Sequence, residues 1–348
     1  MEEIDYLVRV SCMTYNQASY IKDAMNGFCM QETTFPFVCV IIDDASKDGE
    51  QEVIRHFVEE KFDLGEDNVA YEKDTDYGHV TFARNKTNWN CFFSVIYLNE
   101  NHFSLRKPKA PYFKEWMDTK YVALCEGDDY WLDPEKLQKQ VSFLEEHPDF
   151  GFVGTNVKVD NNGVLREEPP MVSSGVIEGD FELIGNVFEF AKCGPPARTV
   201  SLCYRKEVVQ PYVGYLIGDI VLETILAKFS KYAVYRNYAS VYRKGIGISS
   251  SQTELNRALR YNRYYVTSRK IQKKLFPEDC SWNDDELADR GVYVRLIYDI
   301  RKLDWREGLK DKNKLKSRSY KNKTYSKYLF GPVSCFMLNR MLKIKRHE

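Results

Sequence analysis

Apolar runs alternate with segments of helical periodicity along the first half of the chain. Short runs rich in β-branched residues predict buried strands, whereas apolar residues that recur every three or four positions predict helices packed on a sheet. Strand–helix alternation of this kind favours an α/β fold with a mostly parallel sheet covered by helices. The predicted strands are 7–13, 37–44 and 121–125, and the predicted helices lie around 21–29, 53–58 and 133–148.

The remainder of the chain has a less regular pattern. Segment 67–120 is rich in aromatic residues and asparagine, and it predicts loops with one helix near 88–99. Glycine and proline punctuate 150–215, which indicates short strands and turns. The later predicted elements are a helix at 218–229, a strand at 232–244 and helices after residue 253. We therefore expect an α/β domain over 1–250 and a helical, basic extension over 251–348.

Charge is balanced over the whole chain but not along it. The 348 residues include 50 Lys or Arg and 51 Asp or Glu, and 43% of them are hydrophobic. This composition predicts a globular protein and does not favour nucleic-acid binding. Residues 301–348 hold 15 Lys or Arg against 4 Asp or Glu, so the first 300 residues are acidic. The basic end predicts either contact with an anionic surface or a solvated helical tail.

Cysteine usage and the terminal sequence indicate the compartment. The nine cysteines are odd in number, scattered and without a CxxC pair, as expected for free thiols in a reducing cytosol. The N-terminus lacks the basic start and apolar block of a secretory signal, so we expect a cytoplasmic protein.

The Lys- and aromatic-rich stretch 314–330 has two interpretations. It lies peripherally on the inner face of a membrane, or it packs on the body or forms a homodimer.

Two predicted strands end in pairs of carboxylates, Asp43-Asp44 and Asp128-Asp129. In an open parallel sheet, ligands bind outside the carboxyl ends of the strands. Four carboxylates in one crevice repel one another unless a cation or raised pKa values offset their charge. Mg²⁺ or Mn²⁺ bound together with a phosphate is the economical answer, because these ions prefer oxygen ligands. The alternative is that the acids are turn residues and helix caps.

Several segments resemble family 2 glycosyltransferases of the GT-A fold. They are VSCMTYNQASYIKDAM, VIIDDASKDG, YVALCEGDDYWLDPEKLQKQVSFLEEHP and GDIVLETILAKF with VYRKGIGISS, and they occur in the family's order. The resemblance covers about residues 6–250 and leaves out 251–348. It implies a GT-A domain that transfers a sugar, hexosyltransferase-type and with inversion, from a nucleotide-diphosphate sugar. The expected donor is a UDP-sugar, and the expected acceptor is a glycan or a lipid-linked hydroxyl in surface polysaccharide synthesis.

The resemblance assigns the donor nucleoside to the ends of the first two strands. Thr14, Tyr15 and Asn16 match the family's first loop, and Asp43 and Asp44 match its acid pair. A carboxylate accepts hydrogen bonds from a base N–H or a ribose hydroxyl, and an aromatic ring stacks on a base. These five residues are therefore the expected nucleoside-binding set.

The family's acidic metal motif, usually DxD, matches Glu126-Gly127-Asp128 in this chain. The first member is Glu instead of Asp, which leaves open which oxygens contact the metal. We expect Asp128 and Asp129 to hold Mn²⁺ or Mg²⁺, with Asp128 also near the diphosphate and ribose.

The resemblance also assigns the catalytic base and two arginines. An inverting transfer needs a carboxylate that takes the proton of the attacking hydroxyl, and Asp219 matches that position. From the residues alone, a helix N-cap is the favoured interpretation of Asp219, and the resemblance reverses this preference. Arg84, in the segment ARN, is expected to approach the nucleotide. Arg243 is expected at the diphosphate, in segment 241–250, where two glycines allow a lid to hinge.

Two other classes of function compete with the transferase interpretation. A nicotinamide-dependent oxidoreductase needs a glycine-rich turn after the first strand, but no glycine occurs before Gly27. A non-catalytic protein that binds nucleotide sugars on the same scaffold stays open because of Glu126. Turnover of a sugar nucleotide separates the transferase from this binding protein, since only an enzyme shows it.

Overall fold

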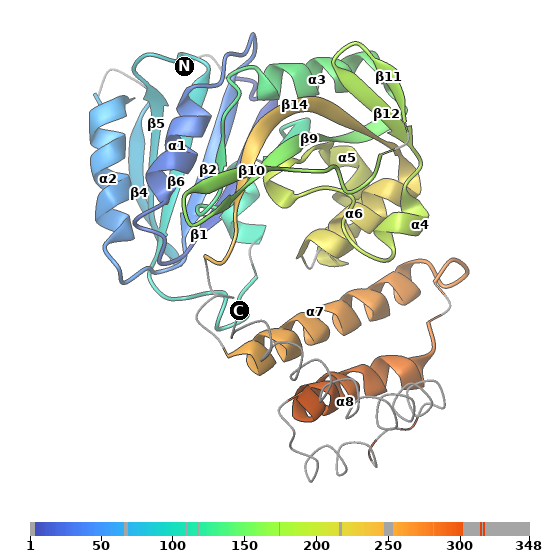
Figure 1. Ribbon diagram of the computed structural model, residues 1–348. Helices are drawn as coiled ribbons and strands as arrows, with labels where there is room; N and C mark the ends of the chain where they lie inside the picture. Colours follow the sequence, from blue (N-terminus) through green and yellow to red (C-terminus); the bar gives the residue numbers. More distant parts are fainter. Residues whose placement is uncertain are drawn as a thin grey trace, which may run out of the picture. The chain divides into compact units, whose positions relative to one another are not determined.

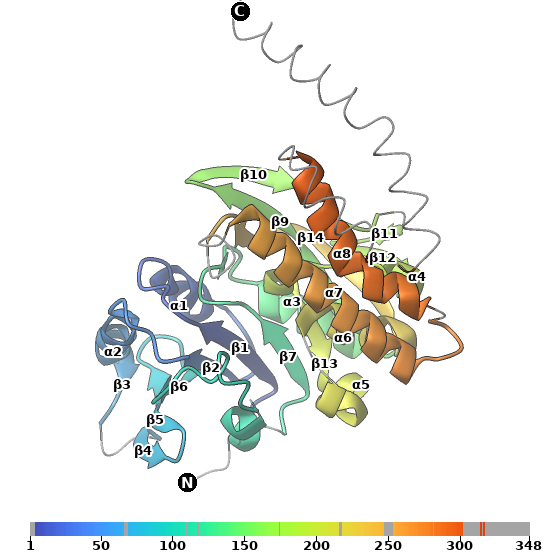
Figure 2. The same ribbon diagram turned by 90° about the horizontal axis from the view of Figure 1, so that it is seen from below.

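The computed structural model describes residues 4–65, 69–108, 110–116, 118–173, 175–215, 218–246, 253–280, 282–301, 314 and 316 (Figures 1 and 2). Internal contacts divide the chain into two compact units, Met1–Ser250 and Ser251–Glu348. The first unit holds the sheet and the acid pairs, and the described part of the second is helical.

One 14-stranded sheet forms the frame of the first unit, in the order β11-β12-β14-β9-β13-β7-β1-β2-β6-β5-β3, with β10, β4 and β8 paired at its sides. Its centre, β7-β1-β2-β6, is parallel, and most pairs on either side are antiparallel. The predicted α/β class with a parallel centre flanked by helices is confirmed. The bounds of the elements are β1 Val8–Thr14, α1 Ile21–Cys29, β2 Phe37–Asp43, α2 Glu50–Lys61, β3 Phe62–Asp63, β4 Tyr71–Thr75, β5 Gly78–Asn85, β6 Cys91–Leu98, η1 Ala110–Trp116, β7 Tyr121–Leu124, β8 Tyr130–Trp131, α3 Lys136–Glu146, β9 Phe150–Asn161, β10 Val164–Glu168, β11 Val176–Glu178, β12 Phe181–Gly185, α4 Phe188–Ala191, η2 Thr199–Ser201, β13 Cys203–Arg205, α5 Lys206–Val209, η3 Gln210–Tyr215, α6 Gly218–Phe229 and β14 Lys231–Arg243.

The central strand β2 is buried at all seven positions because side chains on both of its faces are covered. Its alternate residues belong to two hydrophobic cores, since successive side chains of a strand point to opposite faces. One core takes in Cys39 and Ile41 with the apolar faces of α1, α2 and α3. The other takes in Val40 and Ile42 with aromatic side chains of η1. A run without polar alternation is what burial on both faces requires.

Residues 91–98 form strand β6, so the helix predicted near 88–99 is wrong. The run CFFSVIYL is apolar throughout and buried at every position. Such a run has no period that separates a buried strand from a buried helix. This run forms a strand because it pairs in parallel with β2 and antiparallel with β5. Pairing with β2 joins residues far apart in the sequence, so no local pattern predicts it. The region that looked irregular therefore extends the sheet.

The later part of the first unit brings a second set of strands back to the parallel centre. Strand β9 pairs with β14 in parallel, and β13 links β9 to β7. The short strand β8, just after the second acid pair, joins the end of β14 through Trp131 and Tyr130. The loop after β7 and the end of β14 are thereby held at the same place.

The second unit consists, in its described part, of two helices packed on each other, α7 Glu254–Leu275 and α8 Asp284–Arg301. Thr253 caps α7, because its side chain accepts a hydrogen bond from the backbone N–H of Asn256 at 3.3 Å. None of the helices in the described ranges is both long and apolar enough to cross a bilayer. The stretch 314–330, apart from Lys314 and Lys316, lies outside the described residues.

The burial of β6 makes a stability prediction. Phe93 is fully buried, with its ring centroid 4.2 Å from that of Phe62. We expect Phe93→Ala to lower the free energy of unfolding by about 3–5 kcal/mol, because it removes packing and leaves a cavity. Urea denaturation followed by tryptophan fluorescence measures this. Phe103→Ala, at a ring that is 53% exposed, is the matched control and changes stability by less than about 1 kcal/mol. Equal effects of the two substitutions would contradict the burial of β6.

Candidate functional site

The carboxyl ends of β1, β2 and β7 meet at one edge of the sheet. Thr14 at the end of β1 pairs with Asp43 at the end of β2. The backbone N–H of Asp44 donates to the Thr14 carbonyl at 3.0 Å. The loop after β7 folds against the same strand, since the Gly127 N–H donates to the Met13 carbonyl at 3.1 Å. Parallel pairing therefore brings both acid pairs to one edge, as the sequence predicts.

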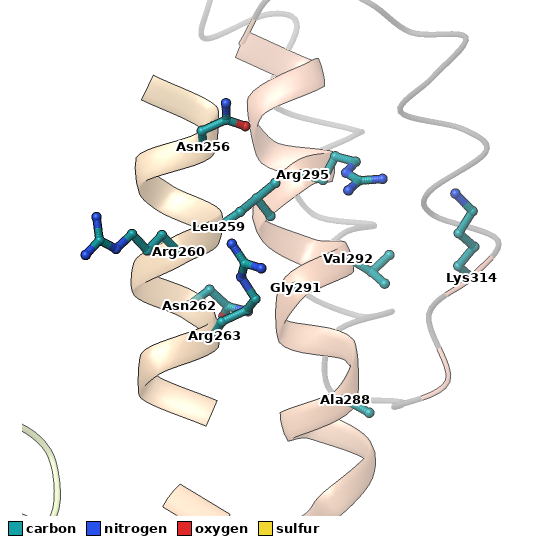
Figure 3. A pocket seen from close by; sticks show the side chains of 10 residues that line it. All are labelled: Asn256, Leu259, Arg260, Asn262, Arg263, Ala288, Gly291, Val292, Arg295 and Lys314. Carbon is teal, nitrogen blue, oxygen red and sulfur yellow. The ribbon is translucent and has the colours of Figure 1, made fainter. Parts of the chain in front are cut away.

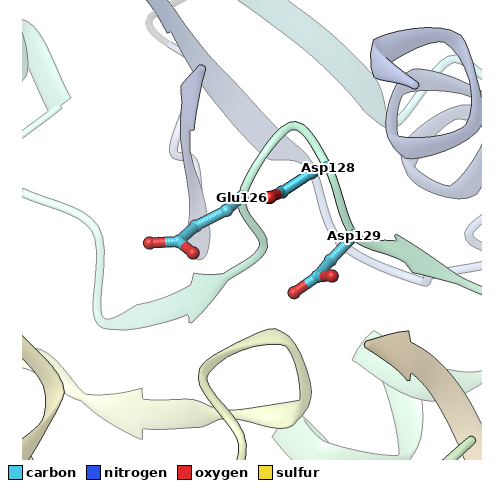
Figure 4. A group of neighbouring side chains, drawn as sticks. All are labelled: Glu126, Asp128 and Asp129. Atoms are coloured by element: carbon cyan, nitrogen blue, oxygen red, sulfur yellow. The ribbon is translucent and has the colours of Figure 1, made fainter. Parts of the chain in front are cut away.

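Three carboxylates gather in the loop after β7. Glu126, Asp128 and Asp129 each offer an oxygen, and these oxygens lie within 4.8 Å of one another (Figure 4). Glu126 is exposed, Asp128 is half-buried and Asp129 is buried. The loop presents all three side chains within four residues, so a bound cation has oxygen ligands from one short turn.

Burial and mutual repulsion raise the affinity of this cluster for protons. Burial, then the neighbouring Asp128 carboxylate, raises the pKa of Asp129 to about 8. Burial also raises the pKa of Asp128, against hydrogen bonds from its own backbone and from Gln17 and the charge of Arg243. Burial thus disfavours the ionised form of both aspartates. A divalent cation would favour that form, and its preference for carboxylate oxygens matches this donor set.

Arg243 holds the acidic loop in place. Its backbone N–H donates to Asp129 Oδ1 at 2.7 Å, and its Nη1 donates to the Asp128 carbonyl at 3.0 Å. The guanidinium forms ion pairs with Asp23 and, at 3.7 Å, with Asp160, and it stacks 4.4 Å from the Tyr130 ring. The structure thus brings Arg243 beside the acids. Residues 247–250 of the same segment, including the second glycine, lie outside the described residues.

Gly127 is required by the close approach of two loops. A Cβ atom at this position would overlap the side-chain oxygens of Thr14 and Gln17. Both belong to the loop after β1, so the middle residue of Glu126-Gly127-Asp128 must lack a side chain if this loop and the acidic loop are to touch.

The loop after β1 is held by Glu50, which the sequence analysis missed. This buried carboxylate accepts hydrogen bonds from Thr14 Oγ1, from the Gln17 N–H at 2.9 Å and from Ser46 Oγ at 2.7 Å. Asn16, exposed on the same loop, accepts from the Lys47 N–H at 2.8 Å. Glu50 is the first residue of α2, where an acid is ordinarily favourable to the helix. No local signal therefore distinguished it as a positioning residue.

The two members of the first acid pair have different surroundings. The carboxylate oxygens of Asp44 accept backbone N–H groups of His102 at 2.6 Å and Phe103 at 3.0 Å. Asp43 Oδ1 accepts from the Ser46 N–H at 3.0 Å and from Gln51 Nε2 at 2.6 Å. Asp43 Oδ2 is buried and has no hydrogen-bond partner within the described part of the chain. Asp44 thus organises a turn, whereas Asp43 keeps an acceptor oxygen at the site.

Arg84 does not lie at this edge of the sheet, which corrects the expectation that it approaches the nucleotide. It pairs with Phe92 near the start of β6, whereas Asp43 pairs with Tyr97 near the end of β6. Five residues of strand separate these two positions, or about 16 Å. The Arg84 guanidinium instead stacks 4.5 Å from the Trp89 ring. The prediction failed because antiparallel β5 presents this end to the opposite edge.

Asp219 lies in the first turn of α6, and Oδ1 of its half-buried side chain accepts the Ile220 N–H at 2.8 Å. One turn later, Glu223 is fully buried and accepts the Ala197 N–H at 2.9 Å. Burial raises the pKa of Glu223 well above its usual range, and the charge of Asp219 adds to this. Sequence reasoning missed Glu223, although an acid on the apolar face of a predicted helix is a detectable signal.

No protein-family model matches the chain. Uncharacterised proteins of Mycobacterium bovis and Mycobacterium tuberculosis are 34% identical to it over 140 residues, which is 39% of this chain. The match spans about a third of the length of these curated relatives, 31%.

Solved structures of glycosyltransferase chains are similar to this chain at low identity. S. aureus TarS is 13% identical with a TM-score of 0.45, over 82% of this chain and 43% of that one. TarS 1–349 in complex with UDP is 16% identical with a TM-score of 0.43, over 82% and 80%. The mannosyltransferase PcManGT from Pyrobaculum calidifontis, in complex with GDP-Man and Mn²⁺, is 12% identical with a TM-score of 0.47, over 94% and 80%. Likenesses of this degree carry no argument about substrate or mechanism.

The contact at Gly127 gives a prediction for the site. We expect Gly127→Ala to push the acidic loop away from Thr14 and Gln17, and so to weaken Mn²⁺ binding by about tenfold or more, since a one-ångström displacement spoils ligand geometry. Titration calorimetry with Mn²⁺ measures this effect. Gly194→Ala is the matched control, because nothing lies within 4 Å of a Cβ there. Unchanged Mn²⁺ affinity in Gly127→Ala would contradict the contact.

The raised pKa of Asp129 gives a prediction for pH dependence. The folded protein keeps this proton up to about pH 8, whereas the unfolded chain loses it near the ordinary value of 3.8. The metal-free protein therefore loses stability as the pH rises between these two values. Because Mn²⁺ must displace this proton, Mn²⁺ affinity should rise from pH 6 to pH 8.

Asp129→Asn tests both effects, since it removes the titrating group and keeps the shape of the side chain. We expect this variant to gain stability relative to wild type as the pH rises toward 8, in melts with chelator, and to lose the pH dependence of Mn²⁺ binding. Parallel melting curves of the two proteins across the whole range would contradict the assignment.

Proposed function

We propose that the chain is an inverting glycosyltransferase that moves a hexosyl group from a UDP-sugar to a hydroxyl of a glycan or lipid-linked acceptor, in polysaccharide synthesis. The observation that carries the proposal is the edge of the sheet where Glu126, Asp128 and Asp129 meet the loop after β1 and the Asp43 carboxylate. A carboxylate cluster that could hold a divalent cation, beside a buried acceptor oxygen, fits a nucleoside diphosphate, which offers both oxygens for the metal and N–H or hydroxyl donors.

The nucleoside end of the donor is assigned to the ends of β1 and β2. Asp43 Oδ2 is buried without a partner among the described residues, and it would accept an N–H of the base or a ribose hydroxyl. Tyr15 offers a half-buried ring for stacking on the base. Thr14 and Asn16 belong to the loop that Glu50 and the 44–48 turn hold in place. Asp44, which shapes the neighbouring turn, acts indirectly.

The diphosphate end is assigned to the acidic loop. Asp128 and Asp129, with Glu126, would hold Mn²⁺ or Mg²⁺, and the cation supplies positive charge to the leaving diphosphate. Arg243 keeps the loop in register through its contacts to both aspartates, and its guanidinium adds positive potential at the same place. Its ion pairs with Asp23 and Asp160 keep this side chain fixed before a donor binds.

The proton of the acceptor is assigned to Asp219. An attacking hydroxyl becomes a better nucleophile when a carboxylate takes its proton in the transition state, which contributes about 10²–10⁴-fold to the rate. The half-buried side chain of Asp219 is set at the start of α6. Burial raises the pKa of Glu223, one turn along the same helix, and so favours its neutral form.

The test combines turnover with nucleotide binding. We expect Asp219→Asn to lower release of UDP from a panel of UDP-sugars by about 10²–10⁴-fold. The same variant should keep the rise in melting temperature that UDP with Mn²⁺ produces, because a ligand stabilises the folded state whether or not it reacts. Asp149→Asn, at an exposed carboxylate, is the matched control and should keep both.

The outcomes separate the components of the proposal. A melting shift by GDP but not UDP would overturn the UDP assignment. Turnover that survives in Asp219→Asn would overturn the assignment of the base. If UDP raises the melting temperature of a wild-type protein that turns over no sugar nucleotide, a non-catalytic binding protein is favoured.

A further inference from the structure

The helical unit contains a cavity of about 760 Å³ that residues of α7 and α8 line together with Lys314 (Figure 3). Its cationic residues Arg260, Arg295 and Lys314 each have interaction partners of their own, so their charge does not call for an anion. Charged groups that the proposed function leaves unused and that face solvent lie instead in the first unit, beside the acid cluster.

Arg198 and Glu168 form a bidentate ion pair that the proposed function does not use. Arg198 Nε donates to Glu168 Oε2 at 2.8 Å, and Nη2 donates to Oε1 at 2.6 Å. The Arg198 side chain is 31% exposed and that of Glu168 is 28% exposed, so a ligand can contact both. The pairing occupies Nε and Nη2 of the guanidinium and leaves Nη1 to donate to a ligand.

Tyr242 connects this ion pair to the acid cluster. The guanidinium carbon of Arg198 is 4.7 Å from the centroid of the Tyr242 ring. Tyr242 immediately precedes Arg243, whose backbone N–H donates to Asp129 Oδ1 at 2.7 Å. Burial, then the charge of Asp129, raises the pKa of Tyr242, which agrees with this closeness. The ion pair and the half-buried Tyr242 ring therefore lie next to the carboxylates that would hold the cation.

The backbone that carries the ion pair is held in place from several sides. Buried Glu223 accepts the Ala197 N–H at 2.9 Å. The Arg198 carbonyl accepts the Ser201 N–H at 2.9 Å and the Ser201 hydroxyl at 2.8 Å. Glu168 belongs to β10, which pairs with β9. Both charged side chains are thus positioned before a ligand arrives, as a selective binding site requires.

The order of the strands indicates which part of a donor these residues face. The sheet runs β2-β1-β7-β13-β9-β14 from the strand of Asp43 to the strand of Tyr242. The nucleoside is assigned to the ends of β1 and β2, and the diphosphate to the loop after β7. Strand β13 is antiparallel to β7, so Arg198, shortly before β13, lies near the end of β7 on the side away from the nucleoside. In a sugar nucleotide, the sugar follows the diphosphate on that side.

We propose that Glu168, Arg198 and Tyr242 form a sugar subsite that binds the transferred sugar of the donor and selects an uncharged hexose. This inference rests on the proposed donor site. Sugar hydroxyls donate to Glu168, Arg198 Nη1 donates to a sugar oxygen, and the Tyr242 ring packs against a C–H face of the sugar. A sugar carboxylate is disfavoured, because Glu168 already neutralises Arg198 and would repel a second carboxylate there.

The test compares a nucleotide with its sugar derivatives on the full chain. Titration calorimetry with Mn²⁺ measures binding of UDP, UDP-glucose and UDP-glucuronic acid, or of GDP and GDP-mannose if GDP is the nucleotide that binds. We expect wild type to bind UDP-glucose more tightly than UDP-glucuronic acid. Glu168→Gln should weaken UDP-glucose about tenfold, the effect of one charge-assisted hydrogen bond, and leave UDP unchanged.

Glu145→Gln is the matched control. The Glu145 carboxylate pairs with Lys120 at 2.7 Å, so this substitution removes the same charge from an ion pair of the same unit. Lys120 precedes the start of β7, whereas the acids follow its end, so this pair lies at the opposite edge of the sheet. The control should bind every probe as wild type does.

Glu168→Gln also makes a prediction about charge. The substitution leaves Arg198 without its carboxylate partner, and a guanidinium of this kind matches the carboxylate of a uronic acid. We expect the affinity for UDP-glucuronic acid, relative to that for UDP-glucose, to rise at least tenfold. Thermal melting checks that the variant is folded. If it melts early, Arg198→Lys decides by the same comparison, since it keeps the charge, loses the bidentate geometry and should weaken UDP-glucose but not UDP.

The outcomes separate this inference from the proposed function. Selective loss of UDP-glucose binding in Glu168→Gln, in a protein without turnover, supports the sugar subsite and overturns the transferase activity. Three results would overturn the subsite alone: equal losses of UDP and UDP-glucose, losses as large in Glu145→Gln, and an unchanged preference between UDP-glucose and UDP-glucuronic acid. A salt bridge that only fastens β10 would give the last result with a lower melting temperature. No binding of any nucleotide would overturn both.

Discussion

Repulsion between carboxylates that parallel pairing brings together is the constraint on which the candidate site depends. The register of β1 with β2 and with β7 fixes where each strand ends, and two of the three strands are followed by acid pairs. Burial raises the free energy of these charges further, as the raised pKa of Asp129 shows. The fold therefore places mutually repelling acids at one edge, where a ligand that brings positive charge would be favoured.

The neighbouring residues reduce this repulsion. Arg243 donates to Asp129 and to the Asp128 backbone, but its guanidinium also pairs with Asp23 and Asp160. One cation is thus divided among several carboxylates. Pairing between β8 and β14 holds the acidic loop and Arg243 together.

Some parts of this arrangement could be predicted from the sequence and others could not. The difference lies in how far apart along the chain the interacting residues are. The strands ending at Asp43 and near Asp128 were predicted because their signal, an apolar run followed by acids, is local in the chain. The edge they share was predicted because parallel strands end together. Arg84 was misplaced and β6 was misread for the opposite reason, since only pairing with distant strands decides their positions. The role of Glu50 could not be predicted from the sequence, because its three hydrogen-bond partners come together only in the folded chain.

Among the described residues, carboxylates gather in the first unit and cationic side chains gather in the second. Acids of the first unit gather at strand ends, where the sheet geometry dictates their position. Cations of the second unit gather between two helices, where residues of one face line a common cavity. In a chain whose net charge is −1, this separation is a local feature of the structure and not a consequence of composition.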